Sequence, residues 1–398
     1  MKILFVTSRF PWPLDKGDKL RAYNQIRYLS KKHEIILFAI SYEHAKAEWI
    51  KELTPYCKQI MIKQLSFPTI IGNLIRHAFS GLPFQTIFFY DRHIANALKQ
   101  FNRIEKPDKI VLQLIRTTKY GDLFKTSHCV VDLMDCLSYH YFLRSKSSSF
   151  PGWLFYDREY RRIKKYETSL LSKYQDIIII SEKDKSLLPG NKFHVKVVGN
   201  GVSRDESEQK IDWDFQRTDL LFLGNLQYRP NIEAASFIIN NIFPGMLAED
   251  PGIHLTIAGI DARKKLSLPQ RKNITIIENL TNTRPLFKSA RVFIAPMFLS
   301  TGIQNKILEA MAYGLPVVTT PNAADAMGAI NGVHLLTAIS AEEFKAQIRI
   351  LLQDEQLRNG IVQNATSFIE RNCDWKKNTK LIETILTGKI TVRQAAQL

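Results

Sequence analysis

The chain has 398 residues and a formal net charge of +17, from 55 Lys and Arg against 38 Asp and Glu. This length suits two domains of ordinary size, each able to bury its own core. No apolar run approaches the ~18 residues of a membrane-spanning helix, and the cysteines (Cys57, Cys129, Cys136 and Cys373) show no metal-binding spacing. We therefore expect a soluble or peripheral protein with free thiols, in a reducing cytoplasm.

The positive charge is concentrated in the first half of the chain. Residues 1–200 hold 33 Lys and Arg against 18 Asp and Glu, whereas residues 201–398 hold 22 against 20. The basic half should face an anionic partner. No recognised nucleic-acid motif is present, so we exclude nucleic acid. A membrane rich in anionic lipid, or an acceptor linked to a diphosphate, fits the charge better.

The first half opens with a strand–helix–strand pattern. Lys2–Ser8 reads as a buried strand, Lys19–Lys32 as an amphipathic helix and Ile35–Ser41 as the next strand. This order predicts an α/β fold with a parallel sheet covered by helices on both faces. Further strands are predicted at Lys58–Ile62, Lys109–Leu114, Cys129–Leu133, Asp176–Ser181 and Lys196–Val198.

The second half restarts the pattern with Leu220–Gly224, a strand that ends in glycine. Two doubly wound, Rossmann-like domains are therefore expected, with their boundary in the polar stretch Ser203–Gln216. We assign residues 1–202 and 203–375 to the two domains and 376–398 to a C-terminal helix. Later strands are predicted at His254–Ala258, Ile274–Ile277, Val292–Ala295, Val317–Thr320 and Gly332–Thr337.

The stretch Ser300–Thr320, STGIQNKILEAMAYGLPVVTT, carries the clearest chemical signal. Thr301 and Gly302 form a small-residue turn before a helix predicted at Ile303–Tyr313. Free backbone N–H groups and the helix dipole make such an N-terminus an anion site. Lys306 adds a charge for a phosphate, and Glu309 lies one turn further on, where a carboxylate can accept hydrogen bonds from sugar hydroxyls. The alternative is an ordinary helix–strand unit with a Gly-Pro turn.

This stretch resembles the donor-binding element of the GT-B glycosyltransferases, specifically the retaining family 4 (glycosyl transferases group 1). Their pattern is E-x7-E followed by A-M-A-x-G-x-P-V-V. The second Glu matches Glu309, and Ala310–Val318 matches the rest without a gap, but Thr301 stands in place of the first Glu. The string G-I-Q-N-K-x-L-E-A-M-A is similar to a subgroup of sugar transferases associated with bacterial exopolysaccharide and exosortase gene clusters. The resemblance implies two Rossmann-like domains facing across a cleft, with the C-terminal helix returning to the first domain.

The resemblance also implies roles for single residues. Glu309 would hold the nucleotide ribose, Gly302, Ile303, Gln304, Asn305 and Lys306 would bind the diphosphate, and Thr301 would lie beside the donor sugar. A second set of donor-binding candidates comes from loops after predicted strands, and each could equally be a solvated turn. These candidates are Gly17 and Arg21 in the first half, Gly224, Asn225 and Arg229 after the strand that restarts the pattern, and Lys264, Glu278 and Leu280 further on.

On the acceptor side, Asp132 and Asp135 close one strand, while Arg116 and Tyr120 follow another. Asp135 and Arg116 are candidate catalytic residues, with helix caps and loop anchors as the alternative. Two stretches suit an anionic membrane surface, Phe67–Phe84 and the aromatic, basic Trp153–Leu171, although their apolar stripes could also be core. The histidines show no metal-binding pairing and no DxD motif is present, so we expect no metal and no cofactor.

These features predict a retaining, metal-independent glycosyltransferase at the cytoplasmic membrane face. It would move a sugar from a UDP- or GDP-sugar to a hydroxyl of a lipid-linked glycan or polysaccharide precursor. Two alternatives stay open. A nucleotide-sugar epimerase shares the GT-B fold, and the departures at Asn225, Pro230 and Thr301 leave room for a non-catalytic subunit that binds sugar nucleotides.

Overall fold

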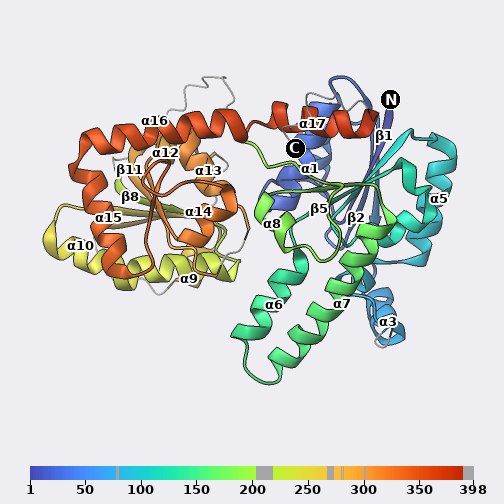
Figure 1. The fold of residues 1–398 in the computed structure, drawn as a ribbon, viewed down its shortest axis with the longest axis horizontal. Helices are drawn as coiled ribbons and strands as arrows, with labels where there is room; N and C mark the ends of the chain where they lie inside the picture. The colour runs from blue at the N-terminus through green and yellow to red at the C-terminus, as the bar shows by residue number, and fades with distance from the viewer. Residues whose placement is uncertain are drawn as a thin grey trace. The chain divides into compact units, whose positions relative to one another are not determined.

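The computed structural model describes residues 1–77, 80–202, 218–266, 273–278, 280, 282–299 and 302–388. The chain forms two compact units (Figure 1). The first comprises Met1–Asn200 and Trp375–Leu398, and the second comprises Gly201–Asp374. These divisions fall within two residues of the sequence-based boundaries, at 200/201 rather than 202/203 and at 374/375 rather than 375/376. Thr301, which was predicted to lie beside the donor sugar, is outside the described residues.

Within the described residues, the first unit contains a seven-stranded sheet in the order β3-β2-β1-β4-β5-β6-β7. Every neighbouring pair is parallel. The central strands β1, β2 and β4 are mainly apolar and buried, as expected for strands covered on both faces, whereas the edge strand β3 is partly exposed. Their bounds are β1 Lys2–Thr7, β2 Glu34–Ser41, β3 Gln59–Gln64, β4 Lys109–Gln113, β5 Cys129–Met134, β6 Asp176–Ile179 and β7 Val195–Val197.

Helices cover both faces of this sheet (Figure 1). Alternate residues of β1 point to opposite faces, so Leu4 and Val6 join one apolar core while Ile3 and Phe5 join the other. The described helices are α1 Gly17–Leu29, α2 Ala47–Leu53, α3 Phe67–His77, α4 Phe84–Phe89, α5 Arg92–Glu105, η1 Thr118–Leu123, η2 Thr126–His128, α6 Leu137–Ser147, α7 Gly152–Lys173, α8 Glu182–Leu187 and α17 Trp375–Thr387.

The C-terminal helix α17 packs against α1 in the first unit (Figure 1). Its apolar stripe, Ile382, Ile385 and Leu386, is buried in the same core as Tyr23 and Ile26 of α1. The spacing of three to four residues puts this stripe on one helical face. None of the described helices is long and apolar enough to cross a membrane.

The second unit contains, within its described residues, a six-stranded parallel sheet in the order β10-β9-β8-β11-β12-β13. Its strands are β8 Thr218–Leu223, β9 Leu255–Ala258, β10 Ile274–Ile277, β11 Ala290–Ala295, β12 Val317–Thr319 and β13 Leu336–Thr337. Its described helices are α9 Arg229–Phe237, η3 Ile238–Ile242, α10 Phe243–Glu249, α11 Ala262–Lys265, α12 Arg284–Ser289, α13 Asn305–Ala312, α14 Pro321–Met327, α15 Ala341–Gln353 and α16 Glu355–Asn372.

Two predicted elements of the second unit are shorter than expected. The helix predicted at Ile303–Tyr313 begins at Asn305 and ends at Ala312, because Gly302 and Gln304 form a turn in which Gln304 Nε2 donates to Gly302 O at 2.9 Å. The strand predicted at Gly332–Thr337 is reduced to Leu336–Thr337. Its first residues form a turn, with Gly332 in the left-handed region (φ 76°) donating to Leu335 O at 2.8 Å.

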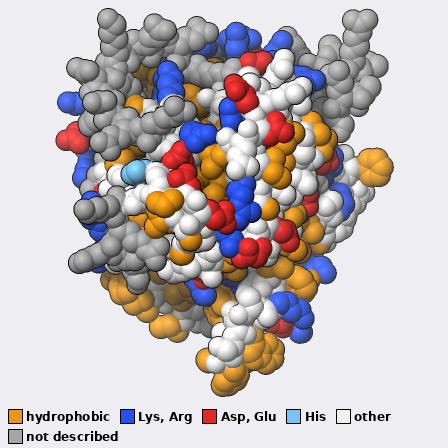
Figure 2. Space-filling model, turned by 90° about the vertical axis from the view of Figure 1, so that its left-hand side faces the viewer, with side chains coloured by type: hydrophobic (Ala, Val, Ile, Leu, Met, Phe, Trp, Pro, Cys, Tyr) orange, Lys and Arg blue, Asp and Glu red, His pale blue; other side chains and the backbone are white. Residues whose placement is uncertain are grey.

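The surface of the second unit mixes both signs of charge. Figure 2 looks onto the side that carries α10 and α15 in Figure 1, and there Lys and Arg side chains alternate with Asp and Glu. This agrees with the near-balanced composition of residues 201–398, which hold 22 Lys and Arg against 20 Asp and Glu. The excess positive charge of the protein therefore lies in the first unit.

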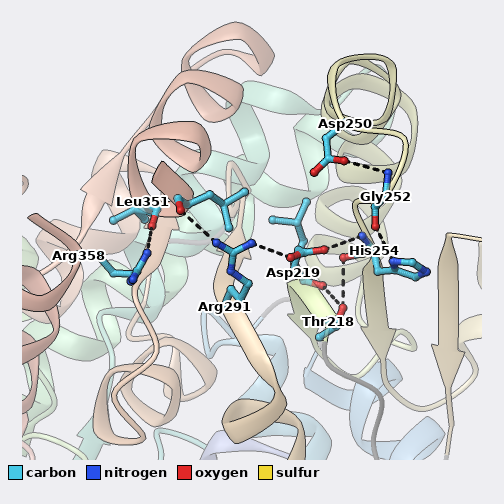
Figure 3. A network of polar contacts seen from close by, with 10 residues as sticks. Thr218, Asp219, Asp250, Gly252, His254, Arg291, Leu351 and Arg358 are labelled. Atoms are coloured by element: carbon cyan, nitrogen blue, oxygen red, sulfur yellow. Dashed lines mark hydrogen bonds and ion pairs between the residues drawn. The ribbon is translucent and has the colours of Figure 1, made fainter. Parts of the chain in front are cut away.

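A polar network holds the amino-terminal edge of the second sheet together (Figure 3). Arg291 of β11 bridges Asp219 of β8 at 3.0 Å and donates to Leu352 O of α15 at 3.1 Å. Asp219 also accepts from the backbone N–H of His254, just before β9, at 3.0 Å. In a parallel sheet all strands begin at one edge and end at the other. The network lies at the edge where the strands begin, so the carboxyl edge is left for ligands.

Candidate functional site

The loop after β8 and the start of α13 meet at the carboxyl edge of the second sheet. Gly224 N donates to Ala258 O at 3.0 Å, and a Cβ at Gly259 would lie only 1.9 Å from Gly224 O. A Cβ at Gly224 would lie 2.9 Å from Asn231 Cγ. Both glycines are therefore required for the close backbone approach that shapes this edge.

Lys306 projects from the first turn of α13 toward this loop. Its Nζ donates to Asn231 Oδ1 and lies 5.3 Å from the centroid of the Phe222 ring. Asn231 in turn donates to Asn225 O at 2.8 Å. Burial lowers the pKa of Lys306 to about 7, because a desolvated ammonium loses hydration energy. No carboxylate of the described residues pairs with it, so an anion at this position would complete its coordination.

The N-terminus of α13 lies beside Lys306. Gln304 occupies the N-cap position with extended backbone angles, and its carbonyl accepts from Ile307 N at 2.9 Å. The Gln304 side chain turns back to Gly302 O instead of capping the helix. Helix polarity and the Lys306 ammonium thus act on the same region, and both favour a negatively charged ligand.

Glu309 lies one turn further along α13, and it is partly buried. Burial raises its pKa to about 7, while the positive charge of Arg284 acts in the opposite direction. Arg284 opens α12 just after the Glu278–Asn282 loop. Sequence reasoning missed Arg284; the available signal was Asn282 and Pro285, which mark a helix start directly after a predicted strand and its loop.

The other donor-binding candidates of the second unit have surface or packing roles. Arg229 forms an exposed ion pair with Glu233 at 2.7 Å, so the structure does not bring its guanidinium to Lys306. Lys264 is exposed in the four-residue helix α11. Glu278 accepts from Arg263 N at 3.1 Å, and Leu280 and Ile303 pack against the core.

In the first unit, Arg21, which was predicted to bind the donor, is held by partners within the protein. Arg21 and Asp132 are both fully buried, and Arg21 Nε bonds Asp132 Oδ2 at 2.7 Å. Its Nη1 donates to Val198 O at 2.9 Å and Asn200 Oδ1 at 3.0 Å. The guanidinium thus links α1 to β5 and to the segment of residues 198–200. Asp132 is equally unavailable as an acid or base, while Gly17 begins α1.

Three acceptor-side residues follow β4 and β5. Asp135 lies 3.7 Å from His140 Nε2. Tyr120 is fully buried, donates to Phe89 O at 2.9 Å and accepts from Asp91 N at 2.9 Å, so it is a loop anchor. Arg116 bonds Gln85 Oε1 at 2.5 Å. Among the described residues, no group of three or more His, Cys, Asp or Glu is placed to hold a metal ion.

The second unit is also similar in sequence to a known family. Residues 217–354 match the family described as Glycosyl transferases group 1. The match lies within the second unit and covers most of it. Gly224, Lys306 and Glu309 all lie within the matched residues, as do the loop after β8 and the helix α13.

Relatives extend the likeness to the whole chain. A Klebsiella pneumoniae protein described as an uncharacterized 44.6 kDa protein in the cps region is 25% identical over 94% of this chain and 97% of its own length. Anabaena Alr3699/HepE, solved in complex with UDP and glucose, superposes with a TM-score of 0.68 at 14% identity, over 97% of this chain and 99% of that one. Sucrose-phosphate synthase (tll1590) from Thermosynechococcus elongatus superposes with a TM-score of 0.66 at 13% identity, over 98% and 99%. The chain therefore has the GT-B fold.

Proposed function

We propose that this protein transfers a sugar, with retention of configuration, from a UDP- or GDP-sugar to a hydroxyl of a lipid-linked glycan or polysaccharide precursor. The observation that carries the proposal is the Lys306 ammonium, held by Asn231 at the N-terminus of α13 and unpaired with any described carboxylate. A diphosphate is the ligand that suits a cation at a helix N-terminus.

In this proposal Lys306 and the α13 amides neutralise the charge that develops on the leaving diphosphate. Glu309 accepts hydrogen bonds from the ribose hydroxyls, and the positive charge of Arg284 opposes part of the rise in its pKa that burial causes. The acceptor hydroxyl attacks from the face of the departing diphosphate, and a phosphate oxygen takes its proton. No metal ion is required for these roles.

Two relatives support the choice of donor and pathway. The Anabaena structure is described with UDP and glucose bound, which favours a uridine nucleotide. The Klebsiella relative is described as lying in a cps region, which favours polysaccharide assembly and a lipid-linked acceptor at the cytoplasmic face of the membrane.

Thermal shifts test the donor site. We would measure the full chain against UDP-, GDP-, ADP- and CMP-sugars, with Lys306→Gln and Glu309→Ala as variants and the exposed Glu355→Ala as the matched control. One nucleotide class should stabilise the wild type and the control, since stabilisation grows with ligand concentration over the dissociation constant. Equal shifts in the Lys306 and Glu309 variants would contradict the assignment.

Turnover distinguishes the alternatives. An epimerase would convert the nucleotide-sugar without acceptor, and a non-catalytic subunit would bind it without turnover in the presence of any acceptor. Transfer that requires a glycan acceptor and keeps the anomeric configuration, followed by NMR of the product, supports the proposal.

An anionic membrane is the proposed partner of the first unit. At the turn between α6 and α7, the tip surface, defined as Phe150, Trp153, Leu154 and Phe155, exposes 76%, 43%, 53% and 48% of these residues. The turn between α6 and α7 is the lowest part of the ribbon in Figure 1. Figure 2 is turned about the vertical axis, so this turn is again the lowest part, and hydrophobic side chains gather there. The adjoining turns of α6 and α7 add exposed basic side chains: Arg144, Lys146, Arg158, Arg161, Lys164 and Lys165.

A second exposed stripe is connected to the tip surface. Phe67, Ile71 and Ile75 recur every four residues on α3, with Phe67 and Ile75 each 73% exposed. Helix α3 packs on α4, and Phe84 of α4 contacts Phe155 ring to ring at 6.1 Å. Exposed aromatic and aliphatic groups flanked by cations suit a bilayer with anionic headgroups.

A further inference from the structure

Two guanidinium groups lie at the carboxyl edge of the first sheet. Strands β1 and β4 are parallel neighbours in which Val6 pairs with Leu112, and Arg9 follows β1 while Arg116 follows β4. Both chains therefore leave the sheet at the edge where ligands bind in open α/β sheets. The two positive charges repel one another. The pKa of Arg116 is lowered mainly by burial and next by the charge of Arg9.

Arg116 is held at this edge by neutral groups. Its Nε donates to Gln85 Oε1 at 2.5 Å, and its Cζ lies 5.1 Å from the centroid of the Phe89 ring. Its Nη1 is buried and has no hydrogen-bond partner. Among the described residues, no carboxylate forms an ion pair with it. A buried guanidinium without a counter-ion is costly, and native proteins normally pair such groups.

Arg9 contributes a second set of donors. Its Nη1 bonds Asp18 Oδ2 at 2.7 Å, while its Nε is buried without a partner. The hydroxyls of Thr7 and Ser8, at the end of β1, are also buried without partners. The negative charges of Asp18 and Asp135 act in the opposite direction on the pKa of Arg116. The partnerless atoms of Arg9, Arg116, Thr7 and Ser8 are N–H and O–H groups, which can donate hydrogen bonds.

We propose that Arg9 and Arg116 form an anion-binding site for a phosphate or diphosphate group, and this assignment of the acceptor rests on the proposed sugar transfer. Guanidinium groups offer paired N–H donors that match phosphate oxygens. The group would belong to an acceptor carried on a phosphate or diphosphate linkage. The same chemistry would suit the diphosphate of the donor, so the experiment separates these two sources.

The probe is inorganic pyrophosphate, titrated calorimetrically into the full chain with and without saturating UDP. We expect pyrophosphate binding that persists when UDP occupies the second unit, and that weakens at least tenfold in both Arg116→Gln and Arg9→Gln. The exposed Arg103→Gln, on α5 of the same unit, is the matched control and should bind as the wild type does. Competition by UDP at the Arg9–Arg116 site would assign the anion to the donor instead of the acceptor.

Melting temperatures distinguish a variant that has lost the anion site from a variant that has unfolded. Arg116→Gln should melt within a few degrees of the wild type without ligand, because it removes a buried charge that lacks a counter-ion, and it should lose the rise in melting temperature that pyrophosphate produces. Arg116→Lys should recover part of that rise. Pyrophosphate binding unchanged in both glutamine variants, or absent from the wild type without UDP, would overturn the site. Failure of UDP to bind would instead count against the donor proposal alone.

Discussion

Lys306 Nζ donates a hydrogen bond to Oδ1 of Asn231, which joins the first turn of α13 to α9. Because Asn231 also donates to Asn225 O at 2.8 Å, one amide side chain fixes both the ammonium and the loop after β8. The position of the cation thus depends on a residue that carries no charge and lies 75 positions away in the sequence.

The first prediction concerns this pair. Lys306→Gln should weaken UDP-sugar binding by about 10- to 100-fold, since a hydrogen bond to a charged group contributes roughly 1.5–3 kcal/mol. Asn231→Ala should weaken it less, and the double variant should resemble Lys306→Gln because the two side chains act together. Calorimetric titration of the three variants measures the coupling. Strictly additive losses would show that the residues act independently.

The second prediction follows from the pKa of Lys306, which burial lowers from 10.5 to about 7. Between these values the unfolded chain binds more protons than the folded protein, so the free energy of unfolding rises with pH in this range. Lys306→Met removes this contribution and should flatten the rise. Urea unfolding from pH 7 to pH 10 compares the two proteins. Parallel curves would refute the burial of the ammonium.

The third prediction has the opposite sign. Burial raises the pKa of Glu309 from 4.5 to about 7, so the folded protein binds more protons than the unfolded chain between these values. The free energy of unfolding contributed by Glu309 therefore falls as pH rises from 4.5 to 7. Glu309→Gln should lessen this fall, whereas the exposed Glu355→Gln should leave it as it is. Unfolding curves from pH 4.5 to pH 8 measure the difference.

The fourth prediction concerns the buried pair of Arg21 and Asp132. Asp132→Asn or Arg21→Met should each destabilise the protein by about 3–5 kcal/mol, since either leaves an uncompensated buried charge. The double variant should lose less than the sum of the single losses. Denaturant midpoints provide the test, and losses below about 1 kcal/mol would restore a ligand-binding role for Arg21.

The fifth prediction concerns the tip surface. Phe150→Ser combined with Leu154→Glu should reduce binding to vesicles that contain phosphatidylglycerol by at least tenfold, because each large apolar side chain contributes about 1.5–3 kcal/mol when buried. Ile104→Ser, which changes an equally exposed apolar residue (68%) on α5, serves as the control. Binding should also fall with salt. Equal loss in the control, or no binding to anionic vesicles, would exclude this surface; dimerisation through the tip would appear as a change in sedimentation.

Much of the fold could be predicted because the local signals were strong. The central strands are uninterrupted apolar runs, and glycine directly follows β8 and β9. The bounds of α13 were less predictable, because Ile303 and Gln304 have the composition of a helix but are held in a turn by the Gln304–Gly302 hydrogen bond. Helix propensity depends on residue type alone, so it could not predict that hydrogen bond.

The sequence alone determined that the chain is α/β, that two doubly wound halves follow one another, and that Lys306 and Glu309 share a helix near a glycine turn, since each of these properties depends on residues close together in the chain. Only the tertiary structure decided what those charged groups meet. Arg21 turned out to be locked against Asp132, 111 residues away, whereas Arg116, with the same side-chain chemistry, has no carboxylate partner among the described residues. Burial and pairing across the sheet set the role of a charge, and neither can be read from local spacing.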